Sequence, residues 1–549
     1  MQIEIAIRNG TVVDGSGAAP VAADVGIAGD RIVAVGDLSG VESARGIDAA
    51  GKLVLPGFID AHGHSEVGLF QNPKCESKTA QGITTEVMGN CGYSPFPMLD
   101  NNRHRYLLDP KGVDLPWSTA QEYYDTARRQ GFAINAVPQL GHIMIRGAVL
   151  DNQDRPATRP EIEAMKVHVR DAMEAGTRGF STGLDYPCST VADLEEIVEL
   201  VSVVGEYGGF YTSHLRGYSR NVINAVAEAI EVGRRTGVRV QLSHLGVFGR
   251  KQWGFMARLM EIMDRARAEG IEVACDMMPY RSKGSWWAPR AIFPAHAYDW
   301  KKPWDENLPA LRVLLGDAAK REALKVEVEA RRARPKYGFH EEFTWFSDWR
   351  DIYIEELAAG SAHRDQIGRS IAEAADHLGV DPCDLYFDLV LNEGEEFGAI
   401  CIQVNEEEFH ALLADPWTMF GTDAIATEFS RLREPWNTIQ PHPRHYGSFP
   451  RVLGRFVRDE KRFALSDAVR RMSGLAADHF GLTDRGYLRT GGFADVVVVD
   501  PDTVAETGTW RLPNSYPLGI DRVIVNGREA FSAGEHTGAL AGHMLTRSN

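Results

Sequence analysis

The stretch GFYTSHLRGYSRNVINAVAEAIEVGRRTGVRVQLSH, from Gly209 to His244, contains the pattern that decides the fold. It begins with a short apolar segment, Gly209 to Thr212, and ends with another, Val238 to Leu242. Between them lies an amphipathic segment, Val222 to Arg235, which stops at Gly237. Short apolar runs on both sides of a helix-length amphipathic run predict a strand–helix–strand unit. Repetition of such a unit builds a parallel sheet.

The same alternation continues along the middle of the chain. Further amphipathic helices are predicted at 161–174 and 194–206, each followed by a glycine. The strand candidates are Leu53 to Asp60, Thr84 to Met88, Ala133 to Gln139, Gly179 to Thr182, Gly209 to Thr212, Val238 to Leu242, Glu272 to Asp276 and Met419 to Gly421. Eight strands alternating with helices predict an α/β fold, a (β/α)₈ TIM-like barrel.

The two ends of the chain have a different pattern, with short strands between turns. Ile3 to Ile7 represents the first end, and ADVVVVD, from Ala494 to Asp500, represents the second. We expect both ends to form one small β-sandwich domain. The predicted division is therefore residues 1–55 and 481–549 for the β domain and 56–480 for the barrel.

Polar residues follow the predicted barrel strands, where the catalytic residues of such barrels lie. His214 and His244 are 30 residues apart, which is the length of one strand–helix unit. In strand order the residues are His62 and His64, Cys91, His142, Thr182, His214, His244, Tyr280 and Asp423. We expect them to converge on one rim of the barrel.

His62 and His64 lie two residues apart at a strand end, so their side chains point the same way and can share a metal ion. An isolated pair of this kind is weak evidence, because surface and core histidines have the same spacing. Histidines after strands five and six and an aspartate after strand eight make the pattern much stronger. Imidazole, thiolate and carboxylate groups together suit Zn²⁺ better than Mg²⁺ or Ca²⁺.

Several longer stretches resemble the amidohydrolase superfamily and, within it, the N-acyl-D-amino-acid deacylases (D-aminoacylases). They are LPGFIDAHGH (55–64), GITTEVMGNCGYSPFP (82–97), GFSTGLDYP (179–187), YTSHLR (211–216), HPRHYGSFPRVLG (442–454) and GLTDRGYLRTGGFADVVVVD (481–500). The GNCG segment is the most informative. Most relatives bridge two metals with a carboxylated lysine or a glutamate, whereas this subgroup resembles one that uses cysteine after the second strand.

The resemblance implies a zinc-dependent amidohydrolase in which Cys91, His214 and His244 hold a tightly bound Zn²⁺. It also implies a weaker second metal site formed by His62, His64 and Asp423. The alternative for Cys91 is that it packs in the core as a small apolar residue, as free cysteines often do. The other five cysteines are expected to be structural.

The implied reaction is amide hydrolysis by metal-activated water. Asp423 would take the proton of the water and return it to the departing amine. The metal would stabilise the oxyanion with help from His142 or Tyr186, which are chosen by position. For Tyr186, simple packing is an equal alternative.

The substrate pocket departs from the resemblance. The deacylases place a lysine that holds the substrate carboxylate two residues after the sixth-strand histidine, but this chain has Gly246. Arg250, Lys251, Arg281 and Lys283 are possible replacements, with a solvated loop charge as the alternative for each. Tyr280, Arg281, Trp286 and Trp287 are the candidate substrate-binding residues after strand seven.

Three functions therefore remain open. The first is a zinc deacylase of N-acyl-D-amino acids or similar N-acyl compounds. The second is a related metal-dependent amidase or lactonase for a neutral or aromatic substrate, which Gly246 favours. The third is a non-catalytic scaffold, against which the complete set of metal ligands argues.

A large insertion is expected after strand seven, at about residues 285–410, because Tyr280 and Asp423 are 143 residues apart. Insertions of this size on the active face often act as lids. The segment 369–378 within it has a helical pattern.

The composition is that of an ordinary enzyme. The 59 Lys and Arg against 76 Asp and Glu give a net charge of −17, which disfavours nucleic acid as a partner. The N-terminus lacks a signal-peptide pattern, no apolar run is long enough for a membrane span, and the six cysteines show no paired spacing. We expect reduced thiols, a cytoplasmic location and a small-molecule substrate, and the oligomeric state stays open.

Overall fold

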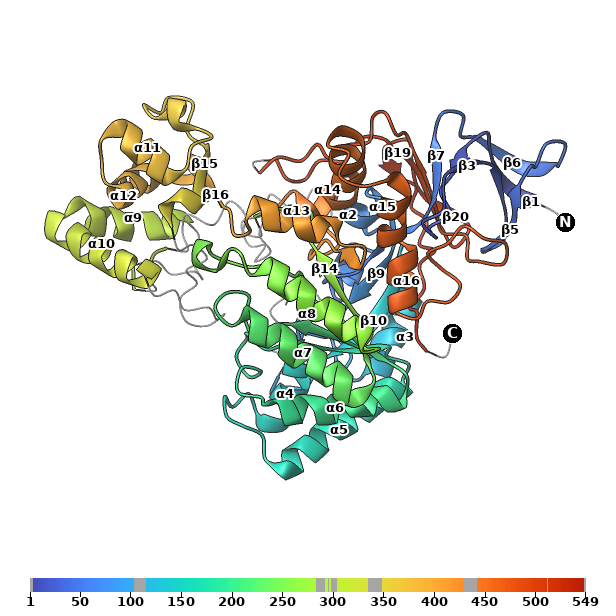
Figure 1. The fold of residues 1–549 in the computed structure, drawn as a ribbon, viewed down its shortest axis with the longest axis horizontal. Coiled ribbons are helices and arrows are strands. Elements are labelled where there is room, and N and C mark those ends of the chain that lie inside the picture. The colour runs from blue at the N-terminus through green and yellow to red at the C-terminus, as the bar shows by residue number, and fades with distance from the viewer. Residues whose placement is uncertain are drawn as a thin grey trace.

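The computed structural model describes residues 3–102, 115–282, 292–294, 296–297, 304–333, 348–427, 442–510 and 512–547. Within them the chain forms a central barrel, a β domain built from both ends of the chain, and an insertion that lies to one side of the barrel (Figure 1).

The barrel consists of eight parallel strands in the order β17-β14-β13-β12-β11-β10-β9-β8. The ring is closed between its first and last strands, where the Ala61 amide donates to the Phe420 carbonyl at 3.1 Å. The strands are β8 Phe58–Asp60, β9 Ile83–Met88, β10 Asn135–Gly141, β11 Gly179–Gly183, β12 Phe210–His214, β13 Arg239–Leu242, β14 Val273–Met277 and β17 Thr418–Phe420. The predicted (β/α)₈ barrel is confirmed, and each of its strands overlaps a predicted one.

One strand prediction needs correction. The segment Leu53 to Asp60 was expected as a single strand, but it divides at Gly57 into β7, Leu53–Pro56, and β8. Strand β7 joins the terminal β domain, whereas β8 opens the barrel. A Cβ atom at Gly57 would lie 2.1 Å from Thr84 Oγ1, so only glycine lets the chain pass β9 this closely.

Helices cover the outside of the barrel, and their ends carry the expected signals. A capping box formed by Thr158 and Glu161 starts α5, and Gly237 ends α7 with a φ of +71°. The helices around the barrel are α1 Gly68–Gln71, α2 Glu76–Thr79, α3 Ala120–Gln130, α4 His142–Leu150, α5 Arg159–Glu174, α6 Leu194–Glu206, α7 Val222–Thr236, α8 Met256–Ala268, α13 Glu406–Ala414, α14 Arg444–Arg451, α15 Leu465–Met472 and α16 Gly474–His479.

The two ends of the chain meet in the β domain, where the C-terminal strand β18, Val496–Val499, pairs with β7. One sheet contains β1 Ile3–Arg8, β4 Asp24–Ala28, β5 Arg31–Gly36 and β6 Ser43–Asp48. The other contains β2 Thr11–Val12, β3 Val21–Ala22, β7, β18, β19 Ile520–Val525, β20 Arg528–Ser532 and β21 Glu535–His536. Both sheets contribute buried side chains to one core, for example Ile7 and Val25 from the first and Val496 from the second.

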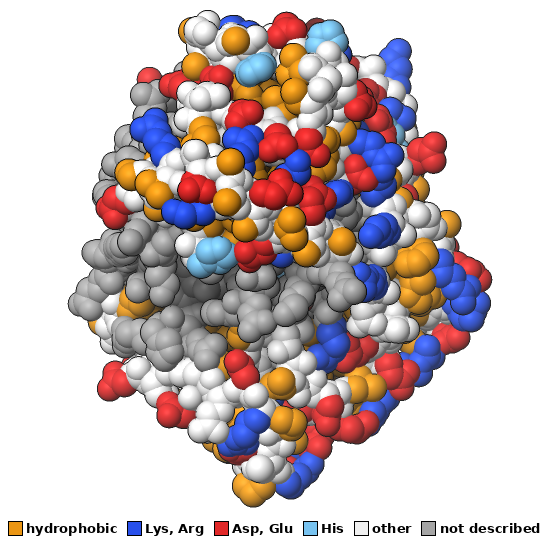
Figure 2. Space-filling view, turned by 90° about the vertical axis from the view of Figure 1, so that its left-hand side faces the viewer, with side chains coloured by type: hydrophobic (Ala, Val, Ile, Leu, Met, Phe, Trp, Pro, Cys, Tyr) orange, Lys and Arg blue, Asp and Glu red, His pale blue; other side chains and the backbone are white. Residues whose placement is uncertain are grey.

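The insertion between β14 and β17 has a hydrophobic core of its own, which includes Leu311, Ile354 and Phe387. Its elements are α9 Trp304–Gly316, α10 Ala318–Ala333, β15 Ile352–Glu356, α11 Ile371–Leu378, α12 Pro382–Glu393 and β16 Gly398–Cys401. Figure 2 views this side of the molecule, where acidic and basic side chains are interspersed over the described surface. A lid function for the insertion stays a prediction.

No helix in the described part of the chain is long and apolar enough to span a membrane. All six cysteines are buried and free.

Candidate metal centre

The predicted ligands converge on the carboxyl end of the barrel, and the backbone is unusual at three of them. Cys91, His244 and Asp423 have positive φ angles of 57°, 34° and 49°. Each of the three directly follows a barrel strand or a short turn after it. Because non-glycine residues pay about 1–3 kcal/mol for such conformations, the fold is holding these side chains in place at a cost in stability.

Cys91, His214 and His244 form one group of possible metal ligands, with ligand atoms all within 4.8 Å of one another. Cys91 Sγ lies 3.5 Å from His244 Nε2, and His214 Nδ1 lies 3.1 Å from the same nitrogen. Ligands at normal distances in a tetrahedral zinc site are about 3.4–3.6 Å apart. The donor atoms and their spacing therefore fit a zinc ion.

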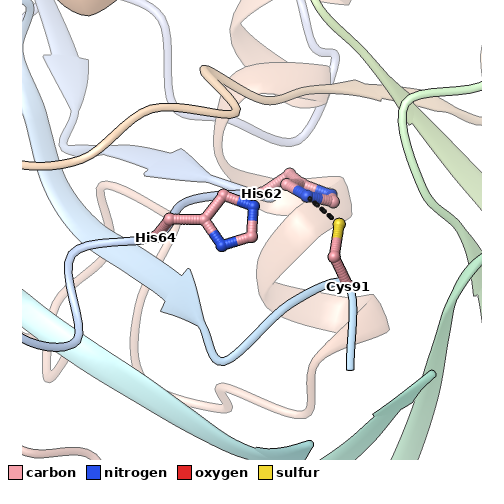
Figure 3. A group of neighbouring side chains, drawn as sticks. All are labelled: His62, His64 and Cys91. Atoms are coloured by element: carbon pink, nitrogen blue, oxygen red, sulfur yellow. Dashed lines mark hydrogen bonds between the residues drawn. The ribbon is translucent and has the colours of Figure 1, made fainter. Parts of the chain in front are cut away.

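His62, His64 and Cys91 form a second group, so the thiolate of Cys91 is shared by both (Figure 3). The Cys91 sulfur lies 3.4 Å from His62 Nε2. Asp423 completes this group, because its Oδ1 lies 3.2 Å from His64 Nε2 and 3.7 Å from His62 Nε2. The six predicted ligands thus occupy one continuous cluster around Cys91.

The charges in the cluster favour a thiolate. Burial alone would raise the pKa of Cys91, but the nearby charge of His62 and hydrogen bonds with His214 and His244 outweigh it and lower the pKa well below its ordinary value. Burial would lower the pKa of His64, but its hydrogen bonds with Asp423 and Cys91 outweigh that effect and raise the pKa to about 10. The thiolate is the form of Cys91 that binds a metal, and a metal bound at His64 would have to displace the proton that the raised pKa places on its ring.

Asp423 is held by an arginine that the sequence argument missed. Arg444 Nη1 lies 3.2 Å from Asp423 Oδ2, on the side of the carboxylate that faces away from the histidines. Burial would raise the pKa of Asp423, but the charge of Arg444 and the hydrogen bond with His64 lower it well below its ordinary value. Arg444 lies in the HPRHYGSFPRVLG stretch, which was the available signal for it.

Further carboxylates orient the histidines. Asp276 Oδ2 lies 3.4 Å from His62 Nδ1, and Asp276 Oδ1 accepts the His244 backbone amide at 2.8 Å. Asp185 Oδ2 lies 3.9 Å from His214 Nε2, which is too far for a hydrogen bond, so this carboxylate acts on His214 through its charge alone. Such contacts fix which ring nitrogen of a histidine faces a metal.

A buried lysine supports the rim behind Asp423. Lys78 Nζ donates to Asp60 Oδ2 at 2.8 Å, to Thr422 Oγ1 at 2.7 Å and to the Ala424 carbonyl at 2.9 Å. It also lies 3.2 Å from Glu86 Oε2. Lys78 is fully buried, and its bonds to the residues on both sides of Asp423 hold that strained turn. The sequence around Lys78 contains no pattern that marks it as a rim residue.

Tyr186 lies at the cluster, with its hydroxyl 3.2 Å from His214 Nδ1 and its ring 4.4 Å from the His214 ring. The structure does not support the predicted role of His142 as an oxyanion donor, because both of its ring nitrogens have other partners. Nδ1 lies 2.8 Å from Ser189 Oγ, and Nε2 lies 2.8 Å from Glu196 Oε1. His142 therefore belongs to a buried network and is not available as an oxyanion donor.

The other candidate substrate residues have partners within the protein. The Tyr280 hydroxyl donates to Glu506 Oε2 at 2.7 Å, and Arg281 Nη1 lies 3.0 Å from Glu406 Oε2. Arg250 pairs with Asp351 of the insertion at 2.5 Å, and Lys251 is exposed. These partners favour structural roles for Tyr280, Arg281 and Arg250, and the exposure of Lys251 fits a solvated loop charge, so their roles in substrate binding stay predictions. Trp286, Trp287 and Lys283 lie outside the described residues.

The glycine that replaces the expected lysine is enclosed by an aromatic wall. A Cβ atom at Gly246 would lie 2.9 Å from Phe248 Cε1 and 3.3 Å from Val404 Cγ2. The Phe248 ring stacks on Tyr218 with centroids 5.1 Å apart, and the Tyr218 ring lies 5.1 Å from that of His244. An apolar surface therefore approaches the metal ligands at this position.

The sequence matches the family described as "Amidohydrolase family" over residues 45–275 and 315–531. The chain belongs to this amidohydrolase family. An N-acyl-D-glutamate deacylase of Alcaligenes xylosoxydans xylosoxydans is 34% identical to this chain. The match covers 96% of this chain and 94% of the deacylase. Identity and coverage this high make the chain a metal-dependent hydrolase of non-peptide carbon–nitrogen bonds.

Two solved structures of the amidohydrolase family share the fold. One, a D-aminoacylase described as having a binuclear metal centre with one-metal activation and second-metal attenuation, has a TM-score of 0.75 at 32% identity and covers 99% of this chain and 100% of that one. The other is an N-acyl-D-glutamate deacylase from Bordetella bronchiseptica, complexed with zinc and a phosphonate mimic of the tetrahedral intermediate. It has a TM-score of 0.75 at 32% identity and covers both chains completely.

Proposed function

We propose that this amidohydrolase is a zinc-dependent deacylase that hydrolyses the amide bond of N-acyl-D-amino acids. The observation that carries the proposal is the convergence of Cys91, His214 and His244 on one point beside His62, His64 and Asp423. The similarity to deacylases of N-acyl-D-amino acids supports the substrate class.

Cys91, His214 and His244 would hold the tightly bound Zn²⁺, since thiolate and imidazole are the ligands that zinc prefers. His62, His64 and Asp423 would form a weaker second site that shares Cys91. The Asp423 carboxylate is already bound by Arg444, which supports weaker metal binding there.

When bound, zinc polarises the substrate carbonyl and makes water a better nucleophile at neutral pH. Asp423 supplies the proton transfers. It is deprotonated at neutral pH because of Arg444, so it can accept the proton of the attacking water at Oδ1. The same oxygen then returns the proton to the amide nitrogen, which otherwise leaves poorly.

Tyr186 is the remaining candidate for stabilising the oxyanion. Burial holds the pKa of the Tyr186 hydroxyl well above its usual range, so the group keeps its proton and can donate a hydrogen bond. Its place beside His214 brings that donor next to the tight metal site.

A second candidate function is hydrolysis of a neutral or aromatic amide or lactone. The observation in its favour is Gly246, where Phe248 fills the space that the lysine would need. The stacked rings of Phe248 and Tyr218 form an apolar wall in place of a cation, and a substrate carboxylate would be desolvated there without a partner.

A cytoplasmic location belongs to the same proposal. Six free cysteines suit a reducing compartment, and a small N-acyl compound is the expected partner. One zinc should suffice for activity, in line with the one-metal activation described for a similar D-aminoacylase.

The test measures amine release by zinc-loaded enzyme from N-acetyl-D- and N-acetyl-L-amino acids and from neutral aryl amides and lactones. Preference for the D-compounds supports the deacylase, and turnover of the neutral set alone supports the second candidate. Cys91→Ala should lose zinc and activity, whereas Cys275→Ala, a buried cysteine in β14, should keep both. Retention of zinc and full turnover by Cys91→Ala would contradict the proposed site.

A further inference from the structure

A cavity of about 500 Å³ lies at the opposite end of the barrel from the metal ligands. Its wall includes Arg178, which directly precedes β11 at the amino end of the barrel, and Arg128 in the last turn of α3. Arg31 of β5 and Arg485 of the C-terminal part complete a set of four arginines from four separate segments. The cavity therefore lies where the barrel meets the β domain, and residues 542–545 near the end of the chain form part of its wall.

Arg178 has no carboxylate partner among the described residues. Its guanidinium donates to three backbone carbonyls, those of Leu545, Gly481 and Thr546, at 2.6, 3.3 and 3.3 Å. Burial, followed by the positive charges of Arg547, Arg485 and Arg239, lowers the pKa of Arg178. Arg178 therefore keeps its charge beside other arginines without a carboxylate of its own among the described residues.

Arg485 provides an independent sign of a missing partner. Its side chain is only 4% exposed, and Nη1 forms an ion pair with Asp495. Its Nη2 atom is buried and has no hydrogen-bond partner in the part of the chain that the structure describes. Leaving a buried donor of a charged group unsatisfied costs about 1–3 kcal/mol or more, so a ligand that accepts this bond would be favoured.

The remaining charges at the cavity are partly balanced. Arg31 lies 3.4 Å from Asp484 and 3.8 Å from Asp30, and Arg128 lies 3.3 Å from Asp125 on its own helix. The guanidinium carbons of Arg31 and Arg485 lie 3.6 and 3.8 Å from the centre of the Phe493 ring, which holds both cations in place. Asp30 and Asp484 line the same cavity, so Arg178 is the cavity arginine that has no carboxylate partner among the described residues.

We propose that this cavity binds a small molecule that carries a phosphate group. Guanidinium groups bind phosphate through paired hydrogen bonds. A phosphate dianion would supply a negative charge beside Arg178 and a hydrogen-bond acceptor for Arg485. The volume exceeds what inorganic phosphate alone requires, so an organic remainder fits beside it. Bound there, the ligand joins the barrel to the β domain and stabilises the folded protein.

The test is calorimetric titration of zinc-loaded enzyme with inorganic phosphate at constant ionic strength, together with the unfolding temperature at each concentration. Arg485→Gln and Arg128→Gln should each weaken phosphate binding by about tenfold or more. Arg258→Gln, an exposed arginine on α8 paired with Glu261, should leave binding unchanged. Deacylase turnover without phosphate should be unaltered in Arg128→Gln, because the cavity is remote from the metal ligands.

Several results would overturn the proposal. Unchanged affinity in both cavity variants would place phosphate elsewhere, for example at the metal centre. Tighter binding of succinate than of phosphate would assign the cavity to carboxylates, and no saturable binding to the wild type below about 10 mM would leave it without this ligand class. If Arg485→Gln fails to fold, Arg128→Gln decides the matter, since the Arg128 side chain is 40% exposed and tolerates replacement.

Discussion

Arg444 and Asp423 form a close ion pair at the edge of the metal centre, with Nη1 of the arginine 3.2 Å from Oδ2 of the aspartate. The other carboxylate oxygen lies 3.2 Å from His64 Nε2. The two contacts fix the plane of the carboxylate, so that one oxygen is committed to the arginine and the other faces the metal ligands. Arg444 therefore acts as a positioning residue for the proposed proton carrier.

Replacing Arg444 should change both the rate and the pH dependence of turnover. Arg444→Gln removes a charge that lowers the pKa of Asp423, so the carboxylate protonates at a higher pH. Since the deprotonated form is active, the acid limb of the kcat/KM profile should move to higher pH, and kcat should fall by about tenfold or more. Arg444→Lys should restore part of the rate, and Arg455→Gln, an exposed arginine paired with Glu460, is the control. An unchanged acid limb in Arg444→Gln would contradict the positioning role.

Asp423→Asn should separate metal binding from catalysis. Asparagine keeps the shape of the side chain but accepts no proton, so turnover should fall by about 10²–10⁴-fold. The tight site needs only Cys91, His214 and His244, so about the wild-type amount of tightly bound zinc should remain. Metal analysis by mass spectrometry checks whether zinc is retained, and an amine-release assay checks the loss of turnover. Near-normal turnover in this variant would remove Asp423 from the mechanism.

Lys78→Met should destabilise the barrel. The substitution leaves the buried carboxylates of Asp60 and Glu86 without their cation, and breaking a buried ion pair in this way typically costs about 3–5 kcal/mol. The unfolding temperature should fall clearly, whereas Lys74→Met, with a side chain 53% exposed, should have little effect. Adding Asp60→Asn to Lys78→Met should recover part of the loss. Equal unfolding temperatures for Lys78→Met and the wild type would show that this network does not stabilise the rim.

The stability of the protein should decrease on mild acidification, partly because of His479 on α16. Burial lowers the pKa of His479 from 6.5 to about 3, so the folded protein cannot protonate it where the unfolded chain can. Lowering the pH from 7 to 5 should therefore reduce the free energy of unfolding by about 2 kcal/mol through this histidine. Urea unfolding at both pH values should show a smaller loss in His479→Leu, with His377→Gln, whose side chain is 51% exposed, as the control. If His479→Leu loses as much unfolding free energy on acidification as the wild type, His479 is not responsible for the loss.

The sequence predicted the barrel and its rim, because both depend on local patterns. Each barrel strand is a short apolar run followed by a polar residue, and this order along the chain is preserved in the fold. The strand prediction failed for the segment from Leu53 to Asp60, because the apolar run continues through Gly57 although the chain changes sheets there. Nothing in the local pattern indicates that Thr84 will lie against that glycine.

The sequence by itself determined the class of chemistry, since His62, His64, Cys91, His214, His244 and Asp423 are marked by their places after predicted strands. Only the tertiary structure decided which groups support them. It brought Arg444 to Asp423, placed Lys78 beneath the rim, turned His142 toward Glu196 and gathered four arginines at the far end of the barrel. The physical reason is that charge pairing and burial depend on distances through space, and residues that are separated along the chain carry no signal of such a meeting in their own neighbourhoods.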